Sequence, residues 1–169
     1  MRWLSFIGLF MMLTSCWPTS VAFVDKGGMP EEWETFFVTN LENNAANTPL
    51  SYDAELSELI RDGVQNNSRL TLNQNGDEAE VNITGSITNY SITPIALQEG
   101  DNASQNRLTV TVQFEILVSK PEEDIMTLSS SRFIDYDSGT DLATVESDLL
   151  TEVSSQIVQD VLNKLMSNW

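Results

Sequence analysis

The stretch RLTVTVQFEILVSK, residues 107–120, decides the fold of this chain. Every second residue from Leu108 to Val118 is apolar, whereas Thr109, Thr111 and Gln113 between them are polar. A period of two is typical of a β-strand that buries one face against a core and leaves the other to solvent or a partner. The stretch therefore predicts a long strand in a sheet that is covered on one side only.

Three further stretches predict strands. Residues 35–41 are aromatic and partly alternating, and residues 126–136 follow a turn that contains proline and acidic residues. Residues 80–92 alternate as well, but the phase of their apolar residues slips part-way along. A slip of one residue indicates a β-bulge, which we expect near Thr88.

Helical periodicity occurs in two places. The first helix is expected to begin near Pro49, with Ser51 as its N-cap, and to end at Asn67. The second is expected to run from about Asp141 to Met166. Apolar residues at helical spacing are Leu56, Leu59, Ile60 and Val64 in the first helix, and Leu142, Val145, Leu149, Val153, Ile157, Val161 and Leu165 in the second.

The order of these elements is strand, helix, strand, strand, strand, helix. The first two strands flank a helix, so a right-handed parallel crossover should join them, while the last three should pair as hairpins. We therefore predict an α+β two-layer sandwich, in which two helices cover one face of a four-stranded mixed sheet.

The beginning of the chain indicates a lipid anchor. Cys16 is the only cysteine, and it follows one arginine, a short apolar stretch and the small residues that a lipoprotein signal requires. We predict that residues 1–15 are a signal peptide, 16–32 a lipidated tether and 33–169 one domain. No aspartate directly follows the cysteine, which favours the outer membrane over the inner membrane.

The composition limits the functions that are open to this chain. Its 25 acidic and 8 basic residues give a formal net charge of −17, which disfavours binding to nucleic acid or to an anionic membrane surface. Histidine is absent, and lipidation would consume the only thiol, so the common catalytic dyads and triads cannot form. We expect no enzyme, although a hydrolase that uses two carboxylates stays an alternative.

Four acidic residues near the last helix have part of the spacing of a calcium loop. Asp135, Asp137, Asp141 and Glu146 occupy its positions 1, 3, 7 and 12, but Gly139 stands where such a loop needs an oxygen ligand. Acidic residues are also favoured at a helix N-terminus. We therefore expect a polar turn that leads into the helix, and no metal site or cofactor.

Several motifs, taken in order, resemble the LptE family of lipopolysaccharide-assembly lipoproteins. The central ones are residues 85–90, then Pro94, and then residues 106–110. The likeness is greatest to the branch whose members end in an acidic helix and a final tryptophan, here residues 146–169. Pro49 and Leu50, Ala96 and Ala103, and Phe133 and Tyr136 also fit the pattern.

The resemblance implies an α/β domain on the periplasmic side of the outer membrane. There it would act as a non-enzymatic plug within the β-barrel translocon LptD, helping the barrel to assemble and lipopolysaccharide to reach the outer leaflet. Family members also bind lipopolysaccharide through basic residues. Contact with the barrel or with lipopolysaccharide is accordingly expected at Tyr90, Pro94, Asn106, Arg107 and Trp169.

Of all the basic residues in the chain, only Arg107 falls in a matching motif. For Arg107 itself an ion pair with a nearby carboxylate is favoured over contact with phosphate. The alternative function is a lipoprotein module that binds a glycan or another envelope component, which would need aromatic side chains on the exposed sheet face.

Overall fold

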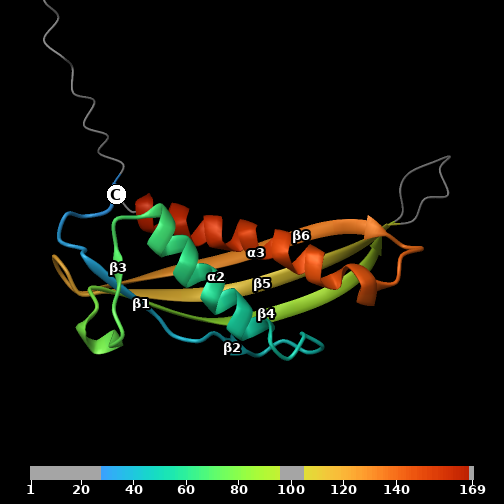
Figure 1. Ribbon diagram of the computed structural model, residues 1–169, viewed down its shortest axis with the longest axis horizontal. Helices are drawn as coiled ribbons and strands as arrows, with labels where there is room; N and C mark the ends of the chain where they lie inside the picture. Colours follow the sequence, from blue (N-terminus) through green and yellow to red (C-terminus); the bar gives the residue numbers. More distant parts are fainter. Residues whose placement is uncertain (1–27, 96–104, 168–169) are drawn as a thin grey trace, which may run out of the picture.

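The computed structural model of the chain describes residues 28–95 and 105–167. In that part of the chain, two α-helices lie against one side of a mixed sheet (Figure 1). The elements in chain order are β1 (Thr35–Val38), β2 (Glu42–Asn43), α2 (Tyr52–Asn67), β3 (Thr71–Leu72), a 3₁₀ turn (Gly76–Glu78), β4 (Val81–Ile95), β5 (Gln105–Val118), β6 (Asp124–Asp137) and α3 (Leu142–Met166).

The sheet confirms the predicted class and corrects the predicted number of strands. Its order is β3-β1-β4-β5-β6, with β2 also paired to β4, so it has six strands rather than four. The expected parallel pairing joins β1 to β4, and the long strands β4, β5 and β6 form antiparallel hairpins as predicted. Strands β2 and β3 have two residues each, which is too short to show any alternation in the sequence.

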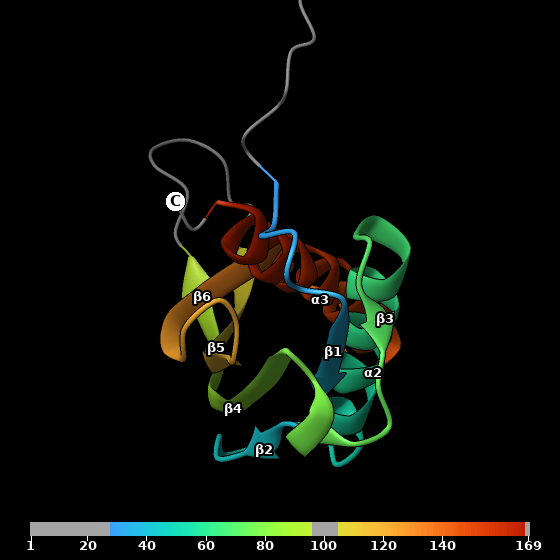
Figure 2. The same cartoon turned by 90° about the vertical axis from the view of Figure 1, so that its left-hand side faces the viewer.

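The core lies between the sheet and the two helices. Figure 2 shows the sheet bending so that both helices lie on its inner side. The apolar side chains of residues 107–120 point into this space. The buried ones include Leu108, Val110, Val112, Phe114 and Ile116. They meet the buried stripe of α3, as the alternation predicts.

Leu59 of α2 was expected in the core but is not buried. Leu56, Ile60 and Val64 of α2 are buried, but Leu59 is 41% exposed. Leu59 sits one position before Ile60 on the helix, so its side chain leaves the stripe that faces the sheet and lies towards the groove between the two helices.

The bulge in β4 is confirmed. Ile87 pairs with Val112 and Asn89 pairs with Thr111, so one extra residue is inserted at Thr88. Before it, Val81, Ile83 and Ile87 are buried; after it, Tyr90 takes the inward position. The bulge thereby turns Tyr90 towards α3.

The two helices contact each other closely at Gly63. A Cβ atom added at this glycine would lie 2.3 Å from Cγ1 of Val158, so any side chain here would clash with α3. The hydroxyls of Tyr52 and Ser154 share a hydrogen bond of 3.0 Å between the same helices. Burial raises the pKa of Tyr52 to about 12.

The helix beginnings differ in how they are capped. Asp141 accepts a hydrogen bond from the N–H of Ala143 at 3.1 Å and so caps α3. Ser51 stands at the predicted N-cap of α2, but its hydroxyl donates to Glu55 at 3.0 Å and does not bond a backbone N–H.

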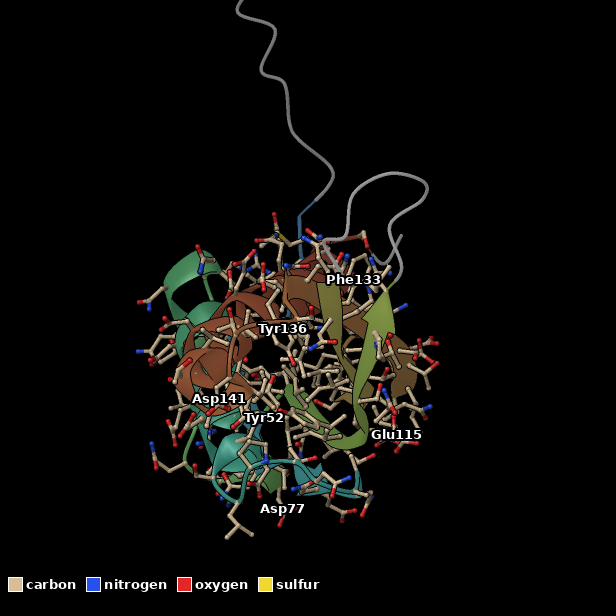
Figure 3. The ribbon with its side chains drawn as sticks, turned by 90° about the vertical axis from the view of Figure 1, so that its right-hand side faces the viewer. Tyr52, Asp77, Glu115, Phe133, Tyr136 and Asp141 are labelled. Atoms are coloured by element: carbon tan, nitrogen blue, oxygen red, sulfur yellow. The ribbon has the colours of Figure 1, made fainter. Side chains whose placement is uncertain are left out.

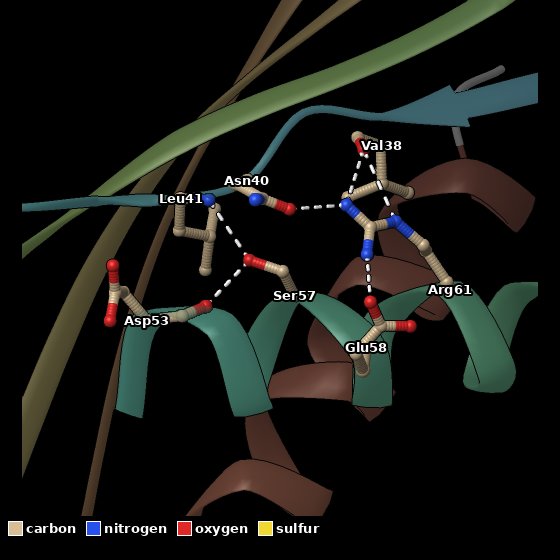
Figure 4. Close-up of polar contacts among 7 residues, drawn as sticks. All are labelled: Val38, Asn40, Leu41, Asp53, Ser57, Glu58 and Arg61. Carbon is tan, nitrogen blue, oxygen red and sulfur yellow. Dashed lines mark hydrogen bonds and ion pairs between the residues drawn. The ribbon is translucent and has the colours of Figure 1, made fainter. Parts of the chain in front are cut away.

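Two polar side chains fasten α2 to the segment after β1 (Figure 4). The hydroxyl of Ser57 accepts from the N–H of Leu41 at 2.9 Å, and it donates to a carbonyl of its own helix. Arg61 donates to the carbonyl of Val38 at 3.0 Å and to the side-chain oxygen of Asn40 at 2.6 Å, and it also pairs with Glu58. Arg61 is therefore engaged within the domain.

A second polar cluster ties the start of the domain to the β5–β6 turn. The carboxylate of Glu80 accepts a hydrogen bond from the N–H of Thr35 at 2.8 Å and another from Nζ of Lys120 at 3.1 Å. It also accepts from the hydroxyl of Thr35. The indole of Trp33 donates to the carbonyl of Lys120 at 2.7 Å. The hydrogen bond from the Thr35 hydroxyl is the main cause that lowers the pKa of Glu80 to about 2.

Candidate interaction surface

The side of β4, β5 and β6 that faces away from the helices is the candidate surface, and we call it the open face. In Figure 3, Glu115 and Phe133 of this face lie on the side of the sheet away from Asp141 at the start of α3. Its central residues are Thr84, Ser86, Ser91, Thr109, Thr111, Gln113, Glu115, Thr127, Ser129 and Ser131. Hydroxyl and amide groups dominate, so the centre of this face is polar but carries little charge.

Some of these hydroxyls bond across the strands. Thr111 and Ser131 share a hydrogen bond of 2.9 Å, and Thr84 donates to the carbonyl of Glu115 at 3.2 Å. These bonds hold the side chains in fixed positions, which favours specific contact with a polar partner.

A hollow of about 670 Å³ opens on this face. Its lining combines two carboxylates with amides and hydroxyls. The segment around β2 supplies one wall, which the sequence did not predict because β2 is so short. The polar side chains that line it include Asn40, Glu42, Thr84, Ser86, Gln113 and Glu115.

The two ends of the open face are more apolar than its centre. Leu117 and Ile125 are direct cross-strand partners at the end near the β5–β6 turn, and they are 48% and 61% exposed. Phe133, which is 49% exposed, lies towards the other end.

Arg107 forms the expected ion pair. Its Nε and one terminal nitrogen bond the two carboxylate oxygens of Asp135 at 2.7 and 2.8 Å, and its guanidinium carbon lies 3.7 Å from the centre of the Phe133 ring. The hydrogen bonds with Asp135 raise the pKa of Arg107, and those from Arg107 lower the pKa of Asp135. The guanidinium is therefore paired and stacked.

Four of the predicted contact residues fall at one end of the sheet. Pro94 is the cross-strand partner of Asn106, and Arg107 follows Asn106 on β5. Tyr90 differs, because its side chain turns to the helix side and its hydroxyl donates to Glu146. Burial is the main cause that raises the pKa of Tyr90, and the bond to Glu146 adds to it.

The other predicted sites, Cys16 and Trp169, lie outside the described residues. Lipidation of Cys16 and contact at all five motif positions stay predictions.

Most basic side chains of the described residues already have partners. Arg69 donates to the carbonyls of Met29 and Pro30, and Arg132 pairs with Asp160. With Arg61, Arg107 and Lys120 engaged as described, Lys164 is the one cation of residues 28–95 and 105–167 that makes no hydrogen bond or ion pair there. In this part of the chain no cluster of unengaged cations is available for a phosphate group.

The four acidic residues of the expected polar turn have separate structural partners. Asp135 pairs with Arg107, Asp137 accepts from the N–H of Gly139, Asp141 caps α3 and Glu146 accepts from Tyr90. Among the described residues, no three acidic side chains come together in a way that could hold a metal ion. In the same residues, no helix combines the length and the apolar character needed to cross a bilayer.

Comparison with known proteins identifies one family. The family model LptE, described as lipopolysaccharide-assembly, matches residues 33–165. No curated protein matches the chain.

A solved structure shares the fold. PelC from Paraburkholderia phytofirmans, solved as a dodecamer, superposes with a TM-score of 0.50 at 12% identity, over 83% of this chain and 95% of that one. Uncharacterized lipoprotein B from Nitrosomonas europaea has a TM-score of 0.49 at 17% identity, over 83% and 85%. A minor lipoprotein from Acinetobacter baumannii has a TM-score of 0.46 at 16% identity, over 79% and 93%.

Proposed function

Because the chain belongs to the LptE family of lipopolysaccharide-assembly proteins, we propose that it is the lipid-anchored accessory subunit of an outer-membrane lipopolysaccharide translocon. In this role it sits as a plug in an LptD-like β-barrel, on the periplasmic side, and helps the barrel to assemble and to deliver lipopolysaccharide to the outer leaflet. The role needs no catalysis. The observation that carries the proposal is the family match, which spans the whole α+β domain.

The open face supports the plug role. The lumen of a large barrel is polar, and a polar sheet face can form matched hydrogen bonds with it. The open face offers rows of hydroxyl and amide groups, with Glu115 as the one charged residue in the middle of β5. A plug in contact with a hydrated wall needs this kind of surface, whereas an obligate apolar interface would expose larger aliphatic side chains.

The anchor is proposed to be a lipid on Cys16. From Cys16 to Gly28, where the described part of the chain begins, the backbone can span at most about 40 Å. The domain would thus stay close to the membrane and to a barrel embedded in it. Two or three acyl chains on one residue hold a protein at a bilayer stably.

The charge distribution favours action through the barrel over direct contact with lipid A phosphates. Five of the six described basic side chains are engaged within the domain, and the chain carries a net charge of −17. Any phosphate approaching this surface would therefore need divalent cations to bridge the like charges.

The test is recovery of the partner. Full-length protein with a C-terminal tag is purified from outer-membrane extract in mild detergent, with the Cys16→Ala variant as control. The proposal expects one large heat-modifiable barrel protein to co-purify with the native chain, and expects depletion of the chain to reduce surface lipopolysaccharide. No barrel in the eluate together with normal surface lipopolysaccharide after depletion would refute it.

One observation favours a second candidate, a glycan-binding module. The hollow on the open face is lined by hydroxyls, amides and the carboxylates of Glu42 and Glu115, groups that can bond sugar hydroxyls. Phe114 is the one aromatic residue in its lining, and its side chain is buried on the helix side. A screen of envelope glycans that finds saturable binding, lost in Glu115→Gln, would favour this candidate over the plug.

A further inference from the structure

The long strand β6 forms one edge of the sheet. It is the outermost strand on its side, and along Asp124–Asp137 the described residues pair with it only through β5. An unpaired edge of this length is a template for another strand, and natural proteins usually block it with proline, lysine or a bulge. β6 contains neither proline nor lysine, and its pairing with β5 is continuous.

The register identifies the backbone groups that face outward. The N–H of Ser119, directly after β5, donates to the carbonyl of Glu80, directly before β4. Backbone groups alternate in direction along a strand, so those of the odd-numbered residues of β5 face β4. The residues between them bond β6, and their partners on β6 are even-numbered, such as Leu128 and Ser130. The odd-numbered residues of β6 therefore point their N–H and C=O groups outward from the free edge of the sheet. These residues are Thr127, Ser129, Ser131 and Phe133.

A groove runs along this edge beside the C-terminal half of α3. It has a volume of about 530 Å³ and lies between β6 and the last turns of the helix. An edge strand beside a helix is the arrangement in which peptide-binding domains accept an extended chain as an added strand. The groove is lined by Leu128, Ser129, Ser131 and Arg132 of β6 and by Asp160, Asn163, Lys164 and Ser167.

The charge in the groove is opposite to that of the chain as a whole. It contains Arg132 and Lys164, while its one carboxylate, Asp160, is already held by Arg132 and by the hydroxyl of Ser130. Lys164 has no partner among the described residues. In a chain of net charge −17 this is a local cationic site, suited to an acidic side chain.

We propose that β6 and α3 together bind an extended acidic segment of the partner barrel, which adds to the sheet as a strand. This inference rests on the proposed function, because it names the partner of that function as the source of the segment. The segment must come from a loop or terminus, since the strands of a closed barrel have no free edge. Its backbone would bond the outward groups of Ser129 and Ser131, and its acidic side chain would pair with Lys164.

The test is hydrogen exchange on the complex that co-purifies with the full-length chain. In the isolated protein, the amides of Ser129 and Ser131 should exchange at least tenfold faster than those of Leu128 and Ser130, because the latter bond β5. In the complex, the peptide that covers residues 127–133 should gain protection.

Two pairs of variants make the result specific. Ser131→Pro removes an outward N–H at a position where an edge strand tolerates proline, and should lower partner recovery roughly fivefold, the effect of about one lost hydrogen bond. Ser131→Ala removes the hydroxyl but keeps the N–H, and should lower recovery less than Ser131→Pro does, because an added strand can still bond the backbone. Lys164→Glu should weaken recovery, whereas Lys164→Arg should not.

The outcomes separate this inference from the proposed function. A recovered barrel with no added protection along β6 overturns the strand addition and leaves the plug role intact. Failure to recover any barrel overturns both. If β6 is already protected in the isolated chain, and a variant ending at Ser167 releases that protection, the chain's own last residues occupy the edge and the inference is wrong.

Discussion

The two faces of β4, β5 and β6 differ in chemistry although their residues alternate along the same backbone. Phe114 is buried against the helices, and its neighbour Gln113 is exposed on the open face. The inner face consists of close-packed aliphatic and aromatic side chains, whereas the open face is lined by hydroxyls and amides. The inner face accounts for the stability of the fold, and the open face is the surface that we propose for the partner.

The largest expected effect comes from a cavity on the inner face. Phe114→Ala should lower the free energy of unfolding by about 4 kcal/mol, because it removes a fully buried ring from a packed core. The adjacent substitution Gln113→Ala should change it by less than about 0.5 kcal/mol. Urea denaturation followed by circular dichroism measures both, and equal losses would show that the two faces do not differ in this way.

A smaller effect concerns the cluster at the start of the domain. The pKa of Glu80 is lowered from 4.5 to about 2, so its carboxylate stabilises the fold fully above about pH 4.5, and this contribution is lost as the pH falls towards 2. Glu80→Gln should lose about 2 kcal/mol at pH 7 and show a weaker loss of stability between pH 4.5 and 2 than the native chain.

Thermal melting at a series of pH values measures this difference. The exposed neighbour Glu78 provides the control variant Glu78→Gln, and the profile of Glu80→Gln should differ from that of the native chain more than the control profile does. Parallel pH profiles for Glu80→Gln and the native chain would contradict the role given to this carboxylate.

The smallest stability effect is expected at the beginning of α3. Asp141→Ala removes the side-chain cap and should cost about 1 kcal/mol. Asp148→Ala, at an exposed position further along the same helix, is the control and should cost less. The comparison separates the contribution of the cap from the effect of removing an acidic side chain elsewhere on the helix, and equal losses would contradict the role of Asp141 as the cap.

The sequence predicts those parts of the fold that are periodic. The alternation in residues 107–120 indicated β5 and its two faces, and the slip in phase indicated the bulge at Thr88. Strands β2 and β3 were missed because two residues carry no period, although β2 lies beside the wall of the hollow. Leu59 was misplaced because helical spacing alone does not say how wide the buried stripe is.

The candidate surface was predictable only in part. The ion pair of Arg107 was expected, and the hairpin register brings Pro94 and Asn106 together as neighbours. The stacking of Arg107 on Phe133 depends on a diagonal contact between strands that no local pattern contains. The groove beside β6 depends on where α3 lies over the sheet, which is set by tertiary packing.

One matched pair of variants tests the assignment of the open face to the partner most directly. Gln113→Arg places a bulky charge on the open face, and Gln65→Arg makes the same change at an exposed position of α2. Both should fold with native stability, and the measurement is the amount of barrel that co-purifies with each full-length chain. We expect recovery to fall with Gln113→Arg and to stay native with Gln65→Arg; native recovery with Gln113→Arg would contradict the assignment of the open face to the partner.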